Sequence, residues 1–182
     1  MSLVSRAQLV DYFVQGEKPR EAWRVGTEHE KFGIYEADFS PVPYTGERGI
    51  AAILKQIAKE DGWEPILEGE QIIGLLKGEA SITLEPGGQL ELSGAPLRTL
   101  HENCREIAQH LELVKRISKP LGIVWIGLGI NPLHGVVDIP KMPKKRYRIM
   151  TEYLPTRGKL ALEMMYTTAT IQANFDYQSE RD

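Results

Sequence analysis

The segment SITLEPGGQLELS at residues 81–93 restricts the fold more than any other stretch of this chain. Two runs of alternating polar and apolar residues flank the tripeptide PGG, which predicts two strands joined by a tight turn. A three-residue loop that pairs Glu85 with Gln89 places all the large apolar side chains on one face, whereas a two-residue loop mixes the faces. Gly88 then occupies the third loop position, which favours a left-handed backbone. The hairpin therefore predicts an antiparallel sheet with an apolar face and a polar face that carries Glu85 and Glu91.

Further strands are predicted where polar and apolar residues alternate or where turns bound an apolar run. The predicted strands lie near 23–35, 71–77, 80–85, 89–93, 121–130 and 168–177. The stretch LGIVWIGLGI at 121–130 is apolar throughout, which is typical of a strand buried on both faces. In 168–177, Thr170, Gln172 and Asn174 share one polar face.

Apolar residues recur at helical spacing in 49–62 and 97–118, which predicts two amphipathic helices. Cys104 lies in the apolar stripe of the second helix, which favours core packing over a reactive role. A capping box that begins at Ser5 predicts a short helix that buries Leu9 and Phe13. Antiparallel strands with helices on one face define an α+β fold.

Two glutamates, Glu28 and Glu30, share one face of the strand 23–35, while Thr27, His29 and Lys31 share the other. Two carboxylates about 6 Å apart at an effective dielectric of about 20 repel by roughly 3 kcal/mol, so something must offset the repulsion. One explanation is bulk water on a solvated strand face, and the other is a divalent cation. His29 belongs to the opposite face, so a structural role is favoured for it.

If the strands are neighbours, the polar faces that carry Glu28, Glu30, Glu85, Glu91 and Gln172 form one surface. Oxygen ligands without a cysteine or histidine cluster select Mg²⁺, Mn²⁺ or Ca²⁺ over Zn²⁺. The residue pattern alone leaves open whether this surface binds a metal ion or faces water.

Lysine and arginine gather in PKMPKKRYRIM, where they occupy positions 141, 144, 145, 146 and 148. This segment is either a solvated surface loop or helix start, or a site that captures an anion, with an arginine that binds a carboxylate or phosphate in a bidentate manner. A cationic cluster beside a carboxylate cluster is what phosphoryl transfer requires. The glycine-rich nucleotide motifs GxGxxG and GxxxxGK[ST] do not occur.

The bulk composition excludes several classes of protein. The 182 residues carry a net charge of −3, and the isoelectric point is about 5.9, which argues against nucleic-acid binding through a basic surface. No apolar run is long enough to span a membrane. The opening MSLVSRAQLVDYF has the composition of neither a signal peptide nor a transit peptide, so the sequence predicts a cytoplasmic protein. With one cysteine, no intrachain disulfide can form.

These segments resemble the amino-terminal part of glutamate-cysteine ligases of the type found in plants and many proteobacteria. The resemblance rests on GTEHEKFG, EGEQIIGL, SITLEPGGQLELSGAPLRTLH, DIPKMPKKRYRIMTEYLP and MMYTTATIQANFDY. It implies a funnel-shaped antiparallel sheet related to glutamine synthetase, with residues 1–182 as the amino-terminal part of a single catalytic domain. It also implies ATP-dependent ligation of the γ-carboxylate of glutamate to cysteine through γ-glutamyl phosphate, the first step of glutathione synthesis.

The resemblance also assigns roles to residues. Metal ligands for Mg²⁺, with Mn²⁺ as a substitute, are expected at Glu28, Glu30, Glu85, Glu91 and Gln172. Arg146 is expected to bind an anionic group of a substrate and Met165 to form a wall of the glutamate pocket. Catalysis would depend on positioning and electrostatics, so no catalytic side chain is expected.

Such ligases continue well beyond the position of Asp182, so the chain is expected to be a fragment that is inactive alone and that self-associates through exposed strand edges. The alternative is a non-catalytic chain that keeps the ligase fold and binds metal or a partner.

Overall fold

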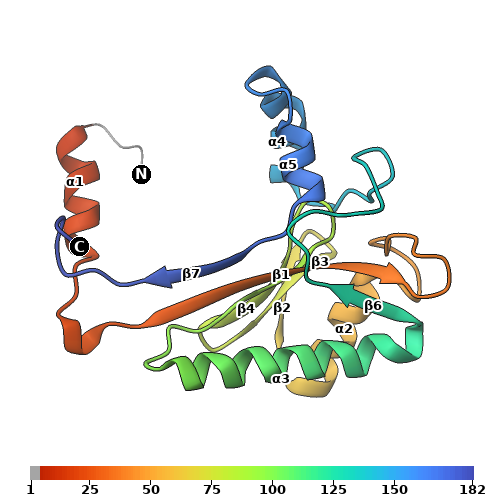
Figure 1. Ribbon diagram of the computed structural model, residues 1–182, viewed down its shortest axis with the longest axis horizontal. Helices are drawn as coiled ribbons and strands as arrows, with labels where there is room; N and C mark the ends of the chain where they lie inside the picture. Colours follow the sequence, from red (N-terminus) through yellow and green to blue (C-terminus); the bar gives the residue numbers. More distant parts are fainter. Residues whose placement is uncertain (1–4) are drawn as a thin grey trace.

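The computed structural model describes residues 5–182 and shows one antiparallel sheet with helices on both sides (Figure 1). The strands are β1 Val25–Tyr35, β2 Glu64–Glu68, β3 Gln71–Lys77, β4 Ala80–Leu84, β5 Leu90–Ser93, β6 Ile123–Ile126 and β7 Ile171–Phe175. Their order is β2-β3-β4-β5-β1-β6, and β7 pairs with the first half of β1. The predicted α+β class with an antiparallel sheet is therefore confirmed.

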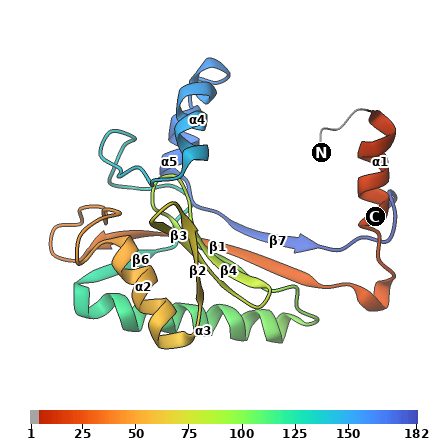
Figure 2. The ribbon, with the colours of Figure 1, turned by 180° about the vertical axis from the view of Figure 1, so that it is seen from behind.

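Helices of different lengths flank the sheet. They are α1 Arg6–Gln15, α2 Ile50–Asp61, α3 Leu100–Ser118, α4 Lys145–Tyr153 and α5 Ala161–Thr167, with 3-10 turns at Arg20–Ala22, Lys119–Leu121 and Leu154–Thr156. Helices α2 and α3 cover one face, as predicted, whereas α4 and α5 rise on the other side (Figures 1 and 2). Helix α4 begins in the basic segment, where a helix start was one of the alternatives, and α5 was not predicted. No helix in residues 5–182 combines the length and the apolar character needed to cross a membrane.

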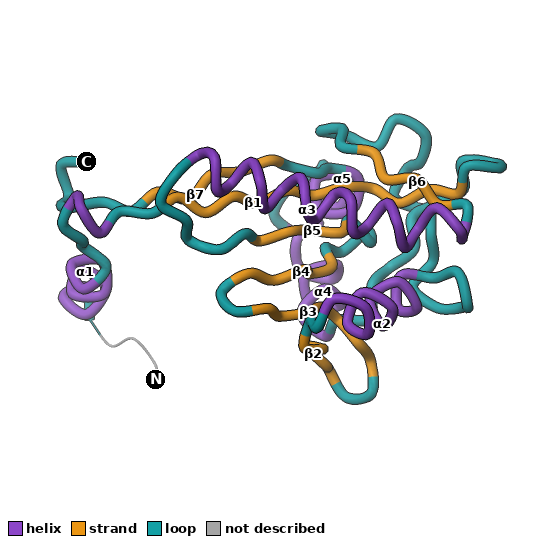
Figure 3. Tube along the Cα trace, turned by 90° about the horizontal axis from the view of Figure 1, so that it is seen from below, coloured by secondary structure: helices purple, strands orange, loops and turns teal. Residues whose placement is uncertain are grey.

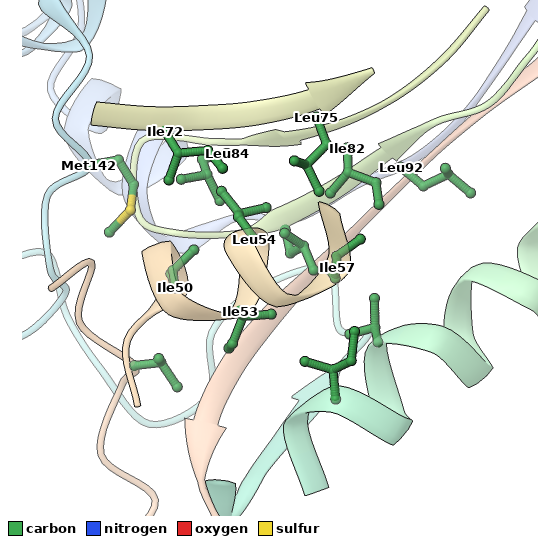
Figure 4. Close-up of a cluster of buried hydrophobic side chains, with 14 of the residues drawn as sticks. Ile50, Ile53, Leu54, Ile57, Ile72, Leu75, Ile82, Leu84, Leu92 and Met142 are labelled. Atoms are coloured by element: carbon green, nitrogen blue, oxygen red, sulfur yellow. The ribbon is translucent and has the colours of Figure 1, made fainter. Parts of the chain in front are cut away.

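The core lies between α2 and strands β3, β4 and β5. Ile50, Ile53, Leu54 and Ile57 recur every three or four residues of α2, so they share one helix face. They pack against apolar side chains of the sheet and against Met142 of the loop before α4. The labelled sheet partners in Figure 4 are Ile72, Leu75, Ile82, Leu84 and Leu92. Each such side chain that leaves water stabilises the fold by roughly 1.5–3 kcal/mol.

The hairpin has the predicted register. The backbone amide of Glu85 donates to the carbonyl of Gln89 at 2.9 Å, and Thr83 lies opposite Glu91. Gly88 closes the three-residue loop with a φ of 82°, in the left-handed region. Turn length and alternation together therefore predicted which residues face the core.

The position of α1 differs from the prediction. The capping box of Ser5 and Gln8 is present, but Leu9 and Phe13 are 46% and 62% exposed, so their predicted burial is wrong. The reason is that α1 lies at the far end of the β1–β7 ribbon, away from the core (Figure 1). Tyr177 holds α1 there by donating to the carbonyl of Phe13 at 2.5 Å.

Helix α3 lies along β1 (Figure 3), and the carboxyl-terminal part of its predicted apolar stripe, Val114 and Ile117, is buried as expected. The amino-terminal part buries a different face from the one predicted. Cys104 is exposed, so its predicted packing in the core is wrong. Asn103 and His110 are buried instead. The strand face beneath α3 is itself partly polar, because Thr27, His29 and Lys31 point away from the glutamates of β1.

The edge strand β6 is shorter and more exposed than predicted. Only residues 123–126 of the apolar stretch form a strand, and Val124 is 38% exposed. The predicted burial on both faces is wrong because β6 is the terminal strand of the sheet and pairs with β1 alone.

Candidate functional site

The sheet brings the predicted metal ligands to one face. Glu30 of β1 lies directly opposite Glu91 of β5, and Glu28 lies directly opposite Gln172 of β7. Opposite residues in an antiparallel pair have Cβ atoms about 4.5–5.5 Å apart, so these side chains are neighbours. Glu85 completes the set at the end of β4, beside the turn. We call Glu28, Glu30, Glu85, Glu91 and Gln172 the carboxylate face.

Glu85 is the most strongly perturbed carboxyl of this face. Burial raises its pKa to about 7, and the neighbouring charges of Glu91 and Glu30 add to the rise, while Lys144 opposes it. The Tyr147 hydroxyl, which donates its proton to the carbonyl of Leu84 at 2.5 Å, lies 3.4 Å from Glu85 Oε1. The rise in pKa therefore comes first from burial, which disfavours the charged form, and second from repulsion between carboxylates.

Glu30 is perturbed in the same direction. Burial raises its pKa, hydrogen bonds from Thr170 lower it, and the charges of Glu91 and Glu28 raise it further. Thr170 donates its backbone N–H to Glu30 Oε2 at 3.0 Å and its hydroxyl to Oε1 at 3.1 Å. The strand that carries Gln172 therefore fixes this carboxylate.

The remaining members of the face also have single polar partners. Asn174 donates its side-chain amide to Glu28 Oε1 at 3.1 Å, and the Thr83 hydroxyl donates to Glu91 Oε2 at 2.6 Å. No lysine or arginine within residues 5–182 forms an ion pair with any carboxylate of the face.

The chemistry of the face fits a hard divalent cation, because every donor is a carboxylate or an amide oxygen. The arrangement is an open row. Within residues 5–182, no three histidine, cysteine, aspartate or glutamate side chains converge closely enough to hold a metal ion. Glu28 accepts from Asn174 at Oε1 alone, so its second oxygen could bind a cation without losing that hydrogen bond. Both oxygens of Glu30 already accept hydrogen bonds from Thr170, so a cation would compete with Thr170 there.

A small cavity of about 180 Å³ adjoins the carboxylate face. Glu30, Glu85 and Gln172 line it together with three methionines, Met150, Met164 and Met165. The structure thus places Met165, which sequence reasoning selected, beside the carboxylates. It is 4% exposed, so it shapes the cavity from a fixed position.

A larger cavity of about 560 Å³ lies between β3 and α4. Its cationic wall consists of Lys141, Lys144, Lys145 and Arg148, and none of these forms an ion pair within the described residues. We call it the basic cavity. It adjoins the carboxylate face because the hydroxyl of Tyr147, which lines the cavity, lies 3.4 Å from Glu85 Oε1.

Arg146 does not line either cavity. Residues 144, 147, 148 and 151 recur at helical spacing and form the lining stripe of α4, and Arg146 falls outside that stripe, where it is exposed. Sequence reasoning missed Tyr147, which donates to the carbonyl of Leu84 at 2.5 Å and contacts Glu85. The signal that could have found it is that an aromatic residue interrupts a run of cations.

A carboxylate face beside a basic cavity is typical of proteins that combine a divalent cation with a phosphorylated substrate. The chain belongs to the glutamate-cysteine ligase family 2 (GCS2), whose model matches residues 24–181.

Curated relatives support the same family. The chain is 49% identical over 179 residues to a chloroplastic glutamate-cysteine ligase of Nicotiana tabacum. The aligned region covers 98% of this chain and 34% of that relative. The chain is 48% identical to glutamate-cysteine ligase A of Oryza sativa subsp. japonica and 47% identical to the Arabidopsis thaliana enzyme, with the same coverage of this chain and 36% and 34% of those relatives. The chain therefore spans about a third of the length of the curated relatives it matches.

These relatives are named chloroplastic, so the predicted cytoplasmic location is wrong. That prediction relied on the composition of the first residues, which carries information on location only where those residues are themselves the targeting segment.

Proposed function

We propose that residues 1–182 are the amino-terminal part of a single catalytic domain that ligates glutamate to cysteine at the expense of ATP, the first step of glutathione synthesis. The observation that carries the proposal is the convergence of four strands on one carboxylate face in a chain of this family. A water-facing sheet needs no such cluster. The raised pKa of Glu85 reflects burial and carboxylate repulsion, which a bound cation would relieve.

In this proposal Glu28, Glu30, Glu85, Glu91 and Gln172 hold Mg²⁺, or Mn²⁺ in its place. The ion would neutralise charge on the transferring phosphoryl group and fix its geometry. The residues of the chain bind and orient, and none acts as a nucleophile.

The two substrates would meet beside this face. An oxygen of the glutamate γ-carboxylate attacks the γ-phosphorus of ATP and ADP leaves, which gives γ-glutamyl phosphate. The amine of cysteine then attacks the γ-carbonyl carbon and phosphate leaves with the electron pair of the broken C–O bond, while the nitrogen loses a proton. Met165 would form the apolar wall of the glutamate pocket.

The basic segment would supply the anion contacts. Lys144 and Arg148 line the basic cavity beside Glu85, and Arg146 is exposed on the same helix, where it can turn towards an anionic substrate group. The lysines and arginine of the basic cavity form no ion pairs with any carboxylate of residues 5–182 and lie beside the carboxylate face. Such an arrangement can bind a nucleotide whose phosphates contact both a metal ion and basic side chains.

Metal binding tests this function most directly. We expect saturable Mn²⁺ binding to the chain by calorimetry, and at least a tenfold weaker affinity in Glu28→Gln/Glu91→Gln. The matched control is Glu79→Gln/Glu112→Gln, which removes two exposed carboxylates outside the face. Equal Mn²⁺ affinity in the wild type and in the Glu28→Gln/Glu91→Gln variant would contradict the proposal and favour a water-facing sheet. Binding that is unaffected by ATP would favour the non-catalytic, metal-binding alternative.

We also propose that the chain self-associates through β7. This strand pairs with β1 on one side, and its residues are all exposed, with Ile171 75% and Phe175 71% exposed. An open edge that carries apolar side chains can pair with another strand. Light scattering should show a mass that rises with concentration in the wild type and less in Phe175→Asp. A concentration-independent monomer would refute self-association.

A further inference from the structure

A third cavity, of about 400 Å³, lies on the helix-covered side of the sheet, between α3, β1 and β6. Its walls are mostly apolar and are formed by Leu111, Val114, Ile123, Val124 and Trp125. Figure 3 shows that α3 runs past β6 at this end of the sheet. The volume lies at the lower end of the roughly 300–1,000 Å³ that is usual for small-molecule sites. An apolar body of modest size therefore fits this cavity.

A buried cation also belongs to the lining. Lys31 is 2% exposed, and its Nζ donates to the carbonyl of His29 at 2.8 Å. No carboxylate within residues 5–182 lies within ion-pair distance of it. An ammonium group has three donors, and a buried charge is costly unless an opposite charge accompanies it. An anionic group in the cavity would supply that charge.

The rim of the cavity is cationic as well. Lys115 and Lys119 line it from the end of α3, both are exposed, and neither forms an ion pair within the described residues. Glu36 is the one carboxylate in the lining, so three lysines face one acid. The charge of this cavity therefore favours an anion over a cation.

We propose that this cavity binds a small carboxylate with an apolar body, whose chain lies against Leu111, Val114 and Trp125 and whose carboxylate meets the lysines. The site is separate from the carboxylate face, because Lys31 follows Glu30 in β1 and successive strand residues point to opposite faces. The inference does not depend on the proposed ligase function.

Calorimetry with three probes of equal chain length tests the proposal. Octanoate, 1-octanol and octylamine share an apolar chain and differ in charge, and a chelator in the buffer prevents octanoate from binding through a metal ion. We expect octanoate to bind at least about tenfold more tightly than octanol, since a charge-assisted hydrogen bond adds to the apolar contact. Octylamine should bind most weakly. No saturable octanoate binding, or equal affinity for octanoate and octanol, would overturn the proposal.

Variants separate the charge from the cavity. Lys31→Met keeps the length of the side chain and should abolish the preference for octanoate over octanol, whereas Lys55→Met, at an exposed lysine of α2, should retain it. Val124→Trp should fill the cavity and weaken both ligands. If Lys31→Met does not fold, Lys115→Gln/Lys119→Gln should still reduce the preference several-fold. An unchanged preference in the folded lysine variants would refute the assignment of the carboxylate to these lysines.

Discussion

Strand β1 carries polar side chains on both faces, and their surroundings differ between the open face and the helix-covered face of the sheet. On the open face, Glu28 and Glu30 accept hydrogen bonds from side chains and backbone of the β7 segment. On the covered face, Lys31 is buried beneath α3, and both ring nitrogens of the buried His110 lack a hydrogen-bond partner within the described residues. The glutamates of the open face thus accept hydrogen bonds from neighbouring residues. The lysine and histidine of the covered face are instead shielded from water by the packing of α3.

The two faces also respond to pH in opposite directions. Burial is the largest cause in both cases, but it raises the pKa of Glu85 to about 7 and lowers the pKa of His110 to about 3. The neutral form is favoured at each position, and neutral means protonated for an acid and deprotonated for a base. The comparison predicts that residues of the covered face contribute most of the free energy of unfolding. It also predicts that carboxylates of the open face lower this free energy and serve to bind a cation.

The largest effect is expected for the apolar part of the covered face. Leu54→Ala should lower the free energy of unfolding by about 3–4 kcal/mol, because the side chain is fully buried between α2 and the sheet and its removal leaves a cavity. Urea unfolding measures the loss. Leu76→Ala, at a side chain that is 41% exposed on β3, serves as the control and should cost less than half as much. Equal losses would mean that α2 does not form the centre of the core.

Glu85→Gln tests the open face. Since the pKa of Glu85 in the folded protein lies above its ordinary value of 4.5, wild-type stability is lost as the pH rises from 4.5 through about 7. Glutamine does not titrate, so this variant should be more stable than wild type by about 2–3 kcal/mol at pH 8 and similar to wild type at pH 4.

Glu79→Gln, at an exposed glutamate, should show no such pH dependence. Saturating Mn²⁺ should reduce the advantage of Glu85→Gln, because the ion stabilises the wild-type carboxylate. An advantage of the same size at pH 4 and pH 8 would show that the carboxylate is not under electrostatic stress.

His110→Leu tests the polar part of the covered face. The pKa of His110 in the folded protein lies below its ordinary value of 6.5, so its contribution is present above pH 6.5 and is lost as the pH falls towards about 3. Wild type should therefore lose roughly 2 kcal/mol more than His110→Leu between pH 7 and pH 5.

The groups of β1 that face His110 are Lys31 and His29, whose charges also disfavour its protonation. A residual slope in His110→Leu would report on His29, whose pKa is lowered by burial. His101→Leu, at an exposed position of the same helix, is the control. Parallel pH profiles of wild type and His110→Leu would contradict the enclosed state of this side chain.

The difference between the faces also explains which predictions from sequence succeeded. Which residues of the hairpin and of β1 share a face follows from the alternation of side chains along a strand and from the length of the turn. Both are local properties of the sequence. The burial of α3 is not local. Apolar spacing selected Cys104, but the helix buries Asn103 and His110 instead, and His110 lies close enough to Lys31 and His29 of β1 for their charges to lower its pKa. A helix buries the face that fits its partner surface, and the sequence of the helix alone does not describe that surface.

The candidate site divides in the same way. Strand alternation brought Glu28, Glu30, Glu91 and Gln172 together because pairing in a sheet is regular. The direction of a side chain on α4 depends on how the helix docks, and for that reason Arg146 lies outside both cavities while Tyr147 contacts Glu85. The sequence therefore failed mainly where the position of a side chain depends on how a helix packs against residues distant in the chain.

The smallest expected effect separates binding from stability on the open face. Thr170→Val removes the hydroxyl that donates to Glu30 Oε1 at 3.1 Å and accepts from the Gln172 side-chain amide at 3.1 Å, but it keeps the backbone N–H that donates to Glu30 Oε2. Thr170 is exposed, so the free energy of unfolding should fall by only about 0.5 kcal/mol. The released oxygen should raise the affinity for Mn²⁺ a few-fold, because Glu30 no longer has to break this hydrogen bond to reach the ion.

Thr156→Val removes a hydroxyl that donates to the carbonyl of Tyr153, away from the carboxylate face. It should leave Mn²⁺ affinity unchanged and so controls for a general effect of the substitution. Calorimetry and urea unfolding on the same samples give both quantities. A fall in Mn²⁺ affinity in Thr170→Val would mean that β7 orients Glu30 for the ion and does not compete with it. The hydrogen bond would then belong to the binding-competent arrangement, and the carboxylate face would need less rearrangement than its open row of side chains indicates.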